Sequence, residues 1–250
     1  MYKTSKSCRL CNSKNIEVLL KLKPMPLGEV YFRKKINAEK VKKYPFSLGL
    51  CQSCKNVQTM EVVKSRMLWT NYTYFSGQTK SILEHFENFS RKVITRFKLN
   101  KNDLVFDIGS NDGSLLKFFK SKKIQVLGID PAENLVRFSN NQNIKTVKGF
   151  FNFETSKKIL KRNNKPKIIT AFNVFAHTED LRGMLKGIKN LLSDDGIFIF
   201  EVQYLGDIYK KKILGTFFHE HMYHYSLFTL KKLFNSFNMN LFDVDKVNIQ

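Results

Sequence analysis

The stretch LVFDIGSNDGSLL, residues 104–116, carries an apolar strand, a polar turn with two glycines and the start of an amphipathic helix. At the end of the strand, Asp107, Gly109 and Gly113 form the pattern D-x-G-x-x-x-G. The glycines let the backbone turn tightly and approach a ligand closely, and the carboxylate offers hydrogen-bond acceptors to a cationic or hydroxyl-bearing group. This pattern is not the G-x-G-x-x-G of dinucleotide-binding folds.

The chain around this turn alternates between short apolar strands and amphipathic helices. The expected strands are LVFDIG (104–109), QVLGID (125–130), KTVKGF (145–150), KIITAFN (167–173) and GIFIFEVQ (196–203). A longer helix precedes them, and its apolar stripe consists of Ile82, Phe86, Phe89, Val93 and Phe97. The alternation predicts an α/β fold, with a parallel sheet covered by helices on both faces.

A second acidic residue stands at the tip of the next strand, in VLGIDPAENL (126–135), about twenty residues after the glycine turn. Asp130 at this position can accept hydrogen bonds from both hydroxyls of a ribose. Taken alone, such a residue is more often a helix cap or a solvated loop residue than a ligand-binding group. Together with the glycine turn, it predicts a nucleoside site.

All four cysteines occur in two C-x-x-C pairs, Cys8 with Cys11 and Cys51 with Cys54. Two such pairs can present four thiolates to one Zn²⁺, and because no coordination position stays open, the metal is expected to be structural. Two disulfides or unrelated thiols are the alternatives. The intervening LLKLKPMPLGEVYF (19–32) and YPFSLGLC (44–51) suit a small β-rich ribbon, a module that also occurs in nucleic-acid-binding proteins.

The chain of 250 residues is strongly basic, with 43 Lys and Arg against 21 Asp and Glu and a formal net charge of +22. The lysines are scattered, which favours solvated surfaces over a nucleic-acid site, and a field that attracts an anionic small substrate is a second interpretation. The first residues lack the apolar run of a secretory signal, and 18 consecutive apolar residues occur nowhere. We therefore expect a cytoplasmic protein that does not bind membranes.

The segment FFHEHMYHYS (217–226) holds three histidines and a glutamate among aromatic residues. A helical zinc-protease site requires H-E-x-x-H, whereas His224 follows His219 and Glu220 one position too late. His219 and His221 could chelate a metal from a strand, but no third ligand is evident, and hydrogen-bonded core histidines are a further alternative. Proton transfer is the favoured interpretation, since histidine titrates near neutrality and can remove a proton from a carbon next to a ketone.

The motifs DIGSNDGSLL (107–116), GIDPAENL (128–135) and AFNVFAHTEDL (171–181), with the paired C-x-x-C and the HEH of residues 219–221, resemble the S-adenosylmethionine-dependent sugar C-methyltransferases. The resemblance implies methylation of carbon 3 of a nucleoside-diphosphate 4-keto-deoxysugar. It also implies a Rossmann-like class I methyltransferase core with a small zinc-ribbon-like N-terminal domain. The expected domains are a zinc-binding domain at 1–70, the methyltransferase core at 71–215, and at 216–250 the HEH segment with the start of a truncated C-terminal α/β domain.

The resemblance also assigns residues to the methyl donor. Asp130 is expected to bind the ribose, and Asn173, after the fourth strand, to help hold the same ligand. His177 is placed at the boundary between donor and substrate, although a satisfied loop histidine is an equal alternative. Phe150 and Phe151 are expected beside the adenine or in the core. The residues expected around the methionine part are Asp107, Gly109, Asn111 and Gly113.

For the substrate side, the resemblance assigns His221 as the base and Glu220 as its neighbour in positioning the substrate or stabilising charge, with His219 in the same catalytic segment. One of Tyr72 and Tyr74 in NYTYFSGQT (71–79), with Tyr74 favoured, is expected to reach the sugar, and interdomain packing is the alternative. Glu201 and Tyr204, after the fifth strand, also match family positions near the substrate.

Two departures from the family pattern affect these expectations. Phe218 stands where the family commonly has a tyrosine before HEH, and the chain ends at DVDKVNIQ (243–250), where family members continue into a further domain. A fragment or a shortened variant is therefore expected, with donor binding retained and sugar methylation weak or absent. The alternatives are methylation of another small molecule or of RNA, and a noncatalytic zinc-ribbon protein, although no RNA-reading motif is apparent.

Overall fold

The computed structural model describes residues 2–28, 40–70 and 72–247. These residues form two compact units. Unit 1 contains Met1–Leu68, Phe175–Leu181 and Val202–Asp243, and unit 2 contains Trp69–Val174, Arg182–Glu201 and Val244–Gln250. This grouping differs from the three consecutive domains expected from the sequence, because most of the segment after the fifth core strand belongs with the N-terminal residues.

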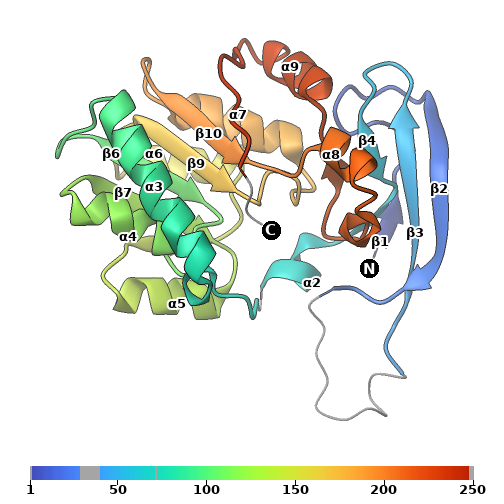
Figure 1. Ribbon diagram of the computed structural model, residues 1–250, viewed down its shortest axis with the longest axis horizontal. Helices are drawn as coiled ribbons and strands as arrows, with labels where there is room; N and C mark the ends of the chain where they lie inside the picture. Colours follow the sequence, from blue (N-terminus) through green and yellow to red (C-terminus); the bar gives the residue numbers. More distant parts are fainter. Residues whose placement is uncertain (1, 29–39, 71, 248–250) are drawn as a thin grey trace. The chain divides into compact units, whose positions relative to one another are not determined.

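Unit 2 is built on a five-stranded parallel sheet (Figure 1). Its strands are β6 (Leu104–Ile108), β7 (Gln125–Asp130), β8 (Thr146–Lys148), β9 (Ile168–Phe172) and β10 (Ile197–Glu201). Their spatial order is β10-β9-β6-β7-β8. Every residue of β6 is buried, as expected for a central strand covered on both faces. The expected α/β fold with a parallel sheet is confirmed.

The strand order places a topological switch point between β6 and β9. The chain runs outward from β6 to β8 on one side, and then returns to β9 on the other side of β6. In sheets of this kind, ligands bind beyond the carboxyl ends of the strands at this point. The motifs after β6, β7 and β9 therefore lie at the edge of the sheet where chemistry is expected.

Helices flank this sheet (Figure 1). They are α3 (Lys80–Arg96), α4 (Ser114–Ser121), α5 (Glu133–Asn141), α6 (Phe153–Leu160) and α7 (Leu181–Leu191), with the short η1 (Ser76–Gln78) before α3. The predicted stripe of α3 is confirmed: Phe86 and Val93 are buried in one apolar cluster with Leu116 and Phe119 of α4. This packing covers one face of the sheet with apolar side chains.

Unit 1 contains a four-stranded antiparallel sheet of order β11-β4-β3-β2. Its strands are β2 (Ile16–Met25), β3 (Tyr44–Cys51), β4 (Val57–Thr59) and β11 (Tyr223–His224). The expected β-rich ribbon between the cysteine pairs is thus present, although residues 29–32 of its first segment lie outside the described residues. Strand β11 carries the end of the HEH segment into this sheet, so the histidines are attached to the cysteine-bearing module.

Further elements complete unit 1. Strand β1 (Tyr2–Thr4) pairs with β5 (Glu61–Val63), and the helices are α2 (Ser65–Trp69), α8 (Leu205–Lys210), η2 (Leu214–Thr216) and α9 (Leu227–Asn235). The last residue of α2, Trp69, is grouped with unit 2. A stack of aromatic rings joins distant segments: Tyr225 stacks on both Tyr223 and Phe175, and Phe175 stacks on Phe234. Among the described residues, no helix combines the length and apolar character needed to cross a membrane.

Candidate functional site

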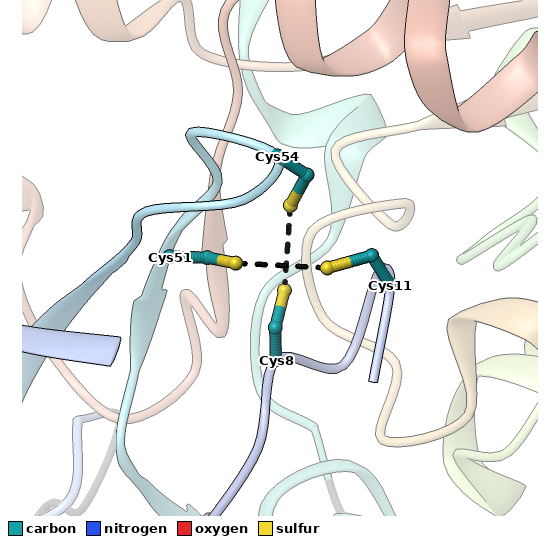
Figure 2. A group of neighbouring side chains, drawn as sticks. All are labelled: Cys8, Cys11, Cys51 and Cys54. Carbon is teal, nitrogen blue, oxygen red and sulfur yellow. Dashed lines mark hydrogen bonds between the residues drawn. The ribbon is translucent and has the colours of Figure 1, made fainter. Parts of the chain in front are cut away.

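Four cysteine thiols meet in unit 1. The sulfurs of Cys8, Cys11, Cys51 and Cys54 lie within 4.8 Å of one another and point toward a common centre (Figure 2). Cys8 Sγ lies 3.5 Å from Cys54 Sγ, and Cys11 Sγ lies 3.6 Å from Cys51 Sγ. Four sulfurs bonded tetrahedrally to Zn²⁺ at about 2.3 Å are roughly 3.8 Å apart, whereas a disulfide needs about 2 Å. The thiols are free and fit a structural zinc ion.

The two C-x-x-C turns have the same backbone conformation. The amide of Asn12 donates to the carbonyl of Cys8 at 2.8 Å, and the amide of Lys55 donates to the carbonyl of Cys51 at 2.8 Å. Asn12 and Lys55 both have a φ of 62°. In each turn, this hydrogen bond connects the residue after the second cysteine to the first cysteine, so the two thiols point to the same side. Two turns of this kind form one four-thiol cluster.

A hydrogen bond between two of the thiols favours the thiolate form that a metal ion binds. The Cys54 thiol donates a hydrogen bond that lowers the pKa of Cys8 to about 5, and the same bond raises the pKa of Cys54. Cys8 is therefore the thiol that ionises first. Because zinc binds thiolates, a bound ion takes the place of the shared protons.

The glycine turn of unit 2 leaves no space for side chains. Gly109 has a φ of 70°, and a Cβ there would lie 2.3 Å from Val174 Cγ2. Gly113 has a φ of 82°, and its Cβ would lie 2.5 Å from Ser139 Oγ. The Gly109 amide also donates to the Ile129 carbonyl at 2.8 Å, which ties the turn to β7. Both positions predicted from the sequence require glycine in this fold.

Two buried carboxylates stand at the tips of β6 and β7. Asp107 accepts from Thr170 Oγ1 at 2.6 Å, while Asp130 accepts from the amides of Ala132 at 2.8 Å and Asn111 at 3.0 Å. Burial raises the pKa of Asp107 to about 7, to which the charge of Asp130 adds, and burial raises the pKa of Asp130 to about 6. Neighbouring carboxylates that are this costly to ionise fit a ligand that brings positive charge and hydroxyl donors.

The tyrosine segment before α3 is fastened to the same turns. Asn111 Nδ2 donates to the Tyr74 carbonyl at 3.0 Å, and Asn111 Oδ1 accepts from the Ser76 amide at 3.1 Å. Asn134, four residues after Asp130, donates to the Tyr72 carbonyl at 2.7 Å. The side chain of Asn111 therefore holds the tyrosine segment, while its backbone amide serves Asp130. Tyr72 and Tyr74 belong to unit 2, with their rings 6.4 Å apart.

Asn173 lies at the end of β9, at the same edge of the sheet, and has a φ of 53°. Its amide donates to the Glu201 carbonyl at 3.0 Å, and its Nδ2 lies 3.4 Å from Glu201 Oε1. The other Glu201 oxygen lies 2.7 Å from His85 Nε2 on α3. Glu201 thus links the end of β9 to a histidine on α3.

His221 in unit 1 is held by one ring nitrogen. Its Nδ1 lies 2.8 Å from the Thr216 carbonyl, and because a carbonyl only accepts, Nδ1 carries the proton. Nε2 then carries the lone pair, and it has no hydrogen-bond partner among residues 2–28, 40–70 and 72–247. Burial lowers the pKa of His221, so the ring is neutral at neutral pH. A neutral imidazole anchored in this way can accept a proton.

A second histidine stacks on this ring. His177 and His221 have ring centroids 5.1 Å apart and planes inclined by 18°. The Met222 amide donates to the Ala176 carbonyl at 2.9 Å, and this bond brings the two chain segments together. Burial lowers the pKa of His177 to about 3. The structure groups His177 with His221 in unit 1, whereas Asp107 and Asp130 belong to unit 2; its expected contact with the donor stays a prediction.

The other members of the HEH segment have different surroundings. His219 is fully buried, donates from Nε2 to the Pro45 carbonyl at 3.0 Å, and contacts the rings of Tyr44 and Phe46. This environment favours the core alternative for His219. Glu220 is also buried, and a Cβ on Gly28 would lie 3.0 Å from its Oε1.

Aromatic rings surround the remaining positions of the segment. The Phe218 ring centroid lies 4.1 Å from that of His221, so the residue that replaces the family's tyrosine contacts the proposed base. His224 is buried in β11 with its ring against Phe217, and burial lowers its pKa to about 3. Phe151 is buried against Phe106, which favours the core alternative for this residue.

Several residues that shape these sites carried no signal in the sequence. Thr216 anchors His221 through its backbone carbonyl, a group that every residue type supplies. His85 meets Glu201 across 116 positions of the chain. Arg9, inside the first C-x-x-C, donates to the carbonyls of Thr59 and Met222. The arginine inside the first C-x-x-C is visible in the sequence, but the two carbonyls to which it donates are not.

Comparisons with known proteins agree with this architecture. A methyltransferase domain family model matches residues 82–244, and a zinc binding domain model matches residues 8–69. The C-methyltransferase NovU of Streptomyces niveus is 28% identical over 242 residues, which cover 97% of this chain and 58% of NovU. The chain thus spans less than two thirds of the length of this relative.

Two further similarities concern parts of the chain. An uncharacterized protein of Methanocaldococcus jannaschii, MJ1252, is 28% identical over 141 residues, covering 54% of this chain and 52% of that protein. Among solved structures, a chain of the complex between the Haloferax volcanii Trm112 methyltransferase activator and a methyltransferase superposes with a TM-score of 0.51. It is 17% identical and covers 64% of this chain and 71% of that one. This likeness concerns the fold.

Proposed function

Because the chain belongs to the methyltransferase domain family, we propose that it methylates carbon 3 of a nucleoside-diphosphate 4-keto-deoxysugar, with S-adenosylmethionine as the donor and His221 as the general base. Similarity to the C-methyltransferase NovU along 97% of the chain supports C-methylation. The observation that carries the proposal is the anchored neutral imidazole of His221, since methylation at a carbon next to a ketone requires a base that removes the proton from this carbon.

Unit 2 provides the groups for the donor. The turn at Gly109 and Gly113 lets the backbone approach the methionine part, with the Asp107 carboxylate beside it. Asp130 accepts hydrogen bonds from the ribose hydroxyls. Asn173, which follows β9 at the same edge of the sheet, helps to hold the same ligand. When bound, S-adenosylmethionine supplies an electrophilic methyl group carried on a cationic sulfur. The raised pKa values of Asp107 and Asp130 fit this charge, because a cation lowers the cost of ionising both carboxylates.

Unit 1 provides the base. A hydrogen on carbon 3 is acidic because its removal leaves an enolate whose charge resides largely on the 4-keto oxygen. Nε2 of His221 takes this proton, and the ring becomes an imidazolium. The Thr216 carbonyl, which already accepts from Nδ1, stabilises the positive ring. His177 stays neutral at the same pH because its pKa is about 3, so the stacked ring adds no repulsive charge.

Further residues on the substrate side belong to this proposal. Glu220 is proposed to position the sugar or balance charge next to His221, and Tyr72 and Tyr74 are proposed to contact the sugar from the segment that Asn111 and Asn134 fasten. Zinc is proposed to be structural, since the four thiols fill its coordination positions.

The test separates proton removal from methyl transfer. In D₂O and without donor, the zinc-loaded chain should exchange the hydrogen on carbon 3 of a nucleotide-bound 4-keto-deoxysugar, detected by mass spectrometry. With donor added, any product that forms should carry one added methyl group. His221→Ala should abolish both signals and retain donor binding in calorimetry. Thr216→Val keeps the anchoring carbonyl and should retain exchange. Exchange at the wild-type rate in His221→Ala would exclude His221 as the base.

A further inference from the structure

The peptide that follows His221 is held by donors on strand β4. Thr59 Oγ1 donates to the His221 carbonyl at 2.7 Å, and the Thr59 amide donates to the Met222 carbonyl at 3.1 Å. Backbone pairing continues from Tyr223 to Gln58 in β11 and β4. The base therefore sits at the start of a strand whose direction is set by the cysteine-bearing module.

A third donor comes from inside the first C-x-x-C turn. Arg9 Nη2 donates to the Met222 carbonyl at 2.6 Å, and Nη1 donates to the Thr59 carbonyl at 2.8 Å. One guanidinium thus spans β4 and the residue next to His221, and its Cζ lies 4.9 Å from the centre of the Tyr223 ring. A planar fork with a fixed charge can hold two carbonyls at once, which a lysine cannot do with the same geometry.

Arg9 is itself fixed at its backbone. It lies between the thiols of Cys8 and Cys11, and its amide donates to Gln58 Oε1 at 2.9 Å. The four-thiol cluster defines the turn that carries Arg9, and Gln58 belongs to the same strand as Thr59. The guanidinium therefore starts from a rigid position and ends on a carbonyl one residue from the proposed base.

The held peptide also determines where His177 lies. Met222 accepts from Arg9 through its carbonyl, and its amide donates to the Ala176 carbonyl at 2.9 Å. Moving this peptide displaces His221 on one side and the His177 segment on the other. Misplacing a reacting group by about 1 Å can cost roughly 100-fold in rate, so the alignment of this peptide matters for proton removal.

We propose that Arg9 is a positioning residue, which holds the peptide carrying His221 in register from within the zinc-binding turn. This inference rests on the proposed function of His221 as the base. The structural metal then has a second consequence in this chain: it fixes the starting point of the contact that aligns the base, without touching the substrate.

The test compares three variants of the full zinc-loaded chain. Arg9→Met keeps a side chain of similar reach and removes the donors, while Arg9→Lys keeps the charge and loses the fork. Ser5→Ala is the matched control, because Ser5 accepts from the same guanidinium at 2.8 Å, while its side chain makes no hydrogen bond of its own to residues 216–224 in the described part of the chain. The measurements are zinc content, donor affinity, kcat and KM, and amide hydrogen exchange of residues 216–224 by mass spectrometry.

Arg9→Met should retain one zinc per chain and bind the donor within about twofold of wild type, while exchange in residues 216–224 becomes about tenfold faster. kcat should fall at least about tenfold with KM unchanged. Arg9→Lys should recover part of both losses, and Ser5→Ala should match wild type. The proposal would be overturned if Arg9→Met showed the wild-type rate of amide hydrogen exchange in residues 216–224 and the wild-type kcat. It would also be overturned if Arg9→Met lost zinc and donor affinity in parallel with kcat.

The failure of the proposed function would have a different signature. If the wild-type chain shows no carbon 3 exchange with the sugar, the substrate assignment fails, and exchange of residues 216–224 in Arg9→Met still decides whether Arg9 holds this peptide. If Arg9→Met does not fold, the same measurements on Arg9→Lys decide the outcome, with unchanged exchange and kcat counting against the proposal.

Discussion

Donor binding should tighten as the pH rises from 5.5 to 7.0, because we propose that the cationic donor binds the ionised forms of Asp107 and Asp130. With pKa values of about 7 and about 6, the ionised fraction of Asp107 rises from about 3% to about 50%, and that of Asp130 from about 24% to about 91%. Affinity scales with the competent fraction, so Kd should fall about 16-fold through Asp107 alone. If binding requires both carboxyls to be ionised and they ionise independently, Kd should fall about 60-fold.

The pH dependence of donor affinity has the opposite sign to the pH dependence of folding stability. A carboxyl whose pKa is raised in the folded chain adds stability below its unfolded value of about 3.9, and this contribution is lost as the pH rises through 6 and 7. The ligand-free protein therefore loses this contribution over the same range in which donor affinity increases. Below pH 7 the donor's amino group stays mostly protonated, since its pKa is about 7.7–8.0.

Isothermal titration calorimetry in buffers of different ionisation enthalpy measures both the affinity and the protons released. At pH 6, binding should release about one proton or more, and the matched variant Asp107→Asn should reduce the change in Kd to about fourfold, the share of Asp130. A Kd that stays constant or rises between pH 5.5 and 7.0 would refute the reasoning. So would the full pH dependence in Asp107→Asn.

Three further outcomes are expected. Removing zinc with a chelator, or replacing Cys54 with serine, should lower Tm by more than about 10 °C in a thermal scan, since the metal stabilises unit 1. Gly109→Ala should cost about 2–4 kcal/mol and abolish donor binding, because its Cβ meets Val174 at 2.3 Å, whereas Gly215→Ala, with nothing within 4 Å, should leave Tm within about 1 °C. Asn111→Ala should speed proteolysis at residues 72–78 and weaken donor binding severalfold, as two hydrogen bonds to that segment are lost.

The parallel sheet and its glycine turn could be predicted because their signals are local. Apolar runs of strand length and the stripe from Ile82 to Phe97 depend on periodicity within one element. The requirement for glycine at positions 109 and 113 follows from a turn of a few residues, and the structure confirms the left-handed φ at both. The grouping of HEH with the cysteine-bearing module could not be predicted in this way, because strand β11 has only two residues and pairs with a distant strand.

In the candidate site, too, the features with local sequence signals could be predicted, and those that depend on contacts between distant segments could not. Asp107 and Asp130 were visible as acidic residues at strand tips, whereas the role of Asn111 as a bracket for Tyr74 required a contact across 37 positions. The HEH pattern by itself indicated a histidine that exchanges protons, and only the family resemblance assigned this role to His221. Burial of His219 against Pro45 and the anchoring of His221 by Thr216 distinguish them.

By itself, the amino-acid sequence determined the class of fold, the four-thiol cluster and the strand tips that we propose as the donor site, since each depends on spacing within a turn or one element. Tertiary structure alone decided which nitrogen of His221 is available, that His177 stacks on it, and that Arg9 reaches Met222 across 213 positions. The physical reason is that these contacts use backbone carbonyls and ring faces, which nearly every sequence offers, and only the folded chain selects among them.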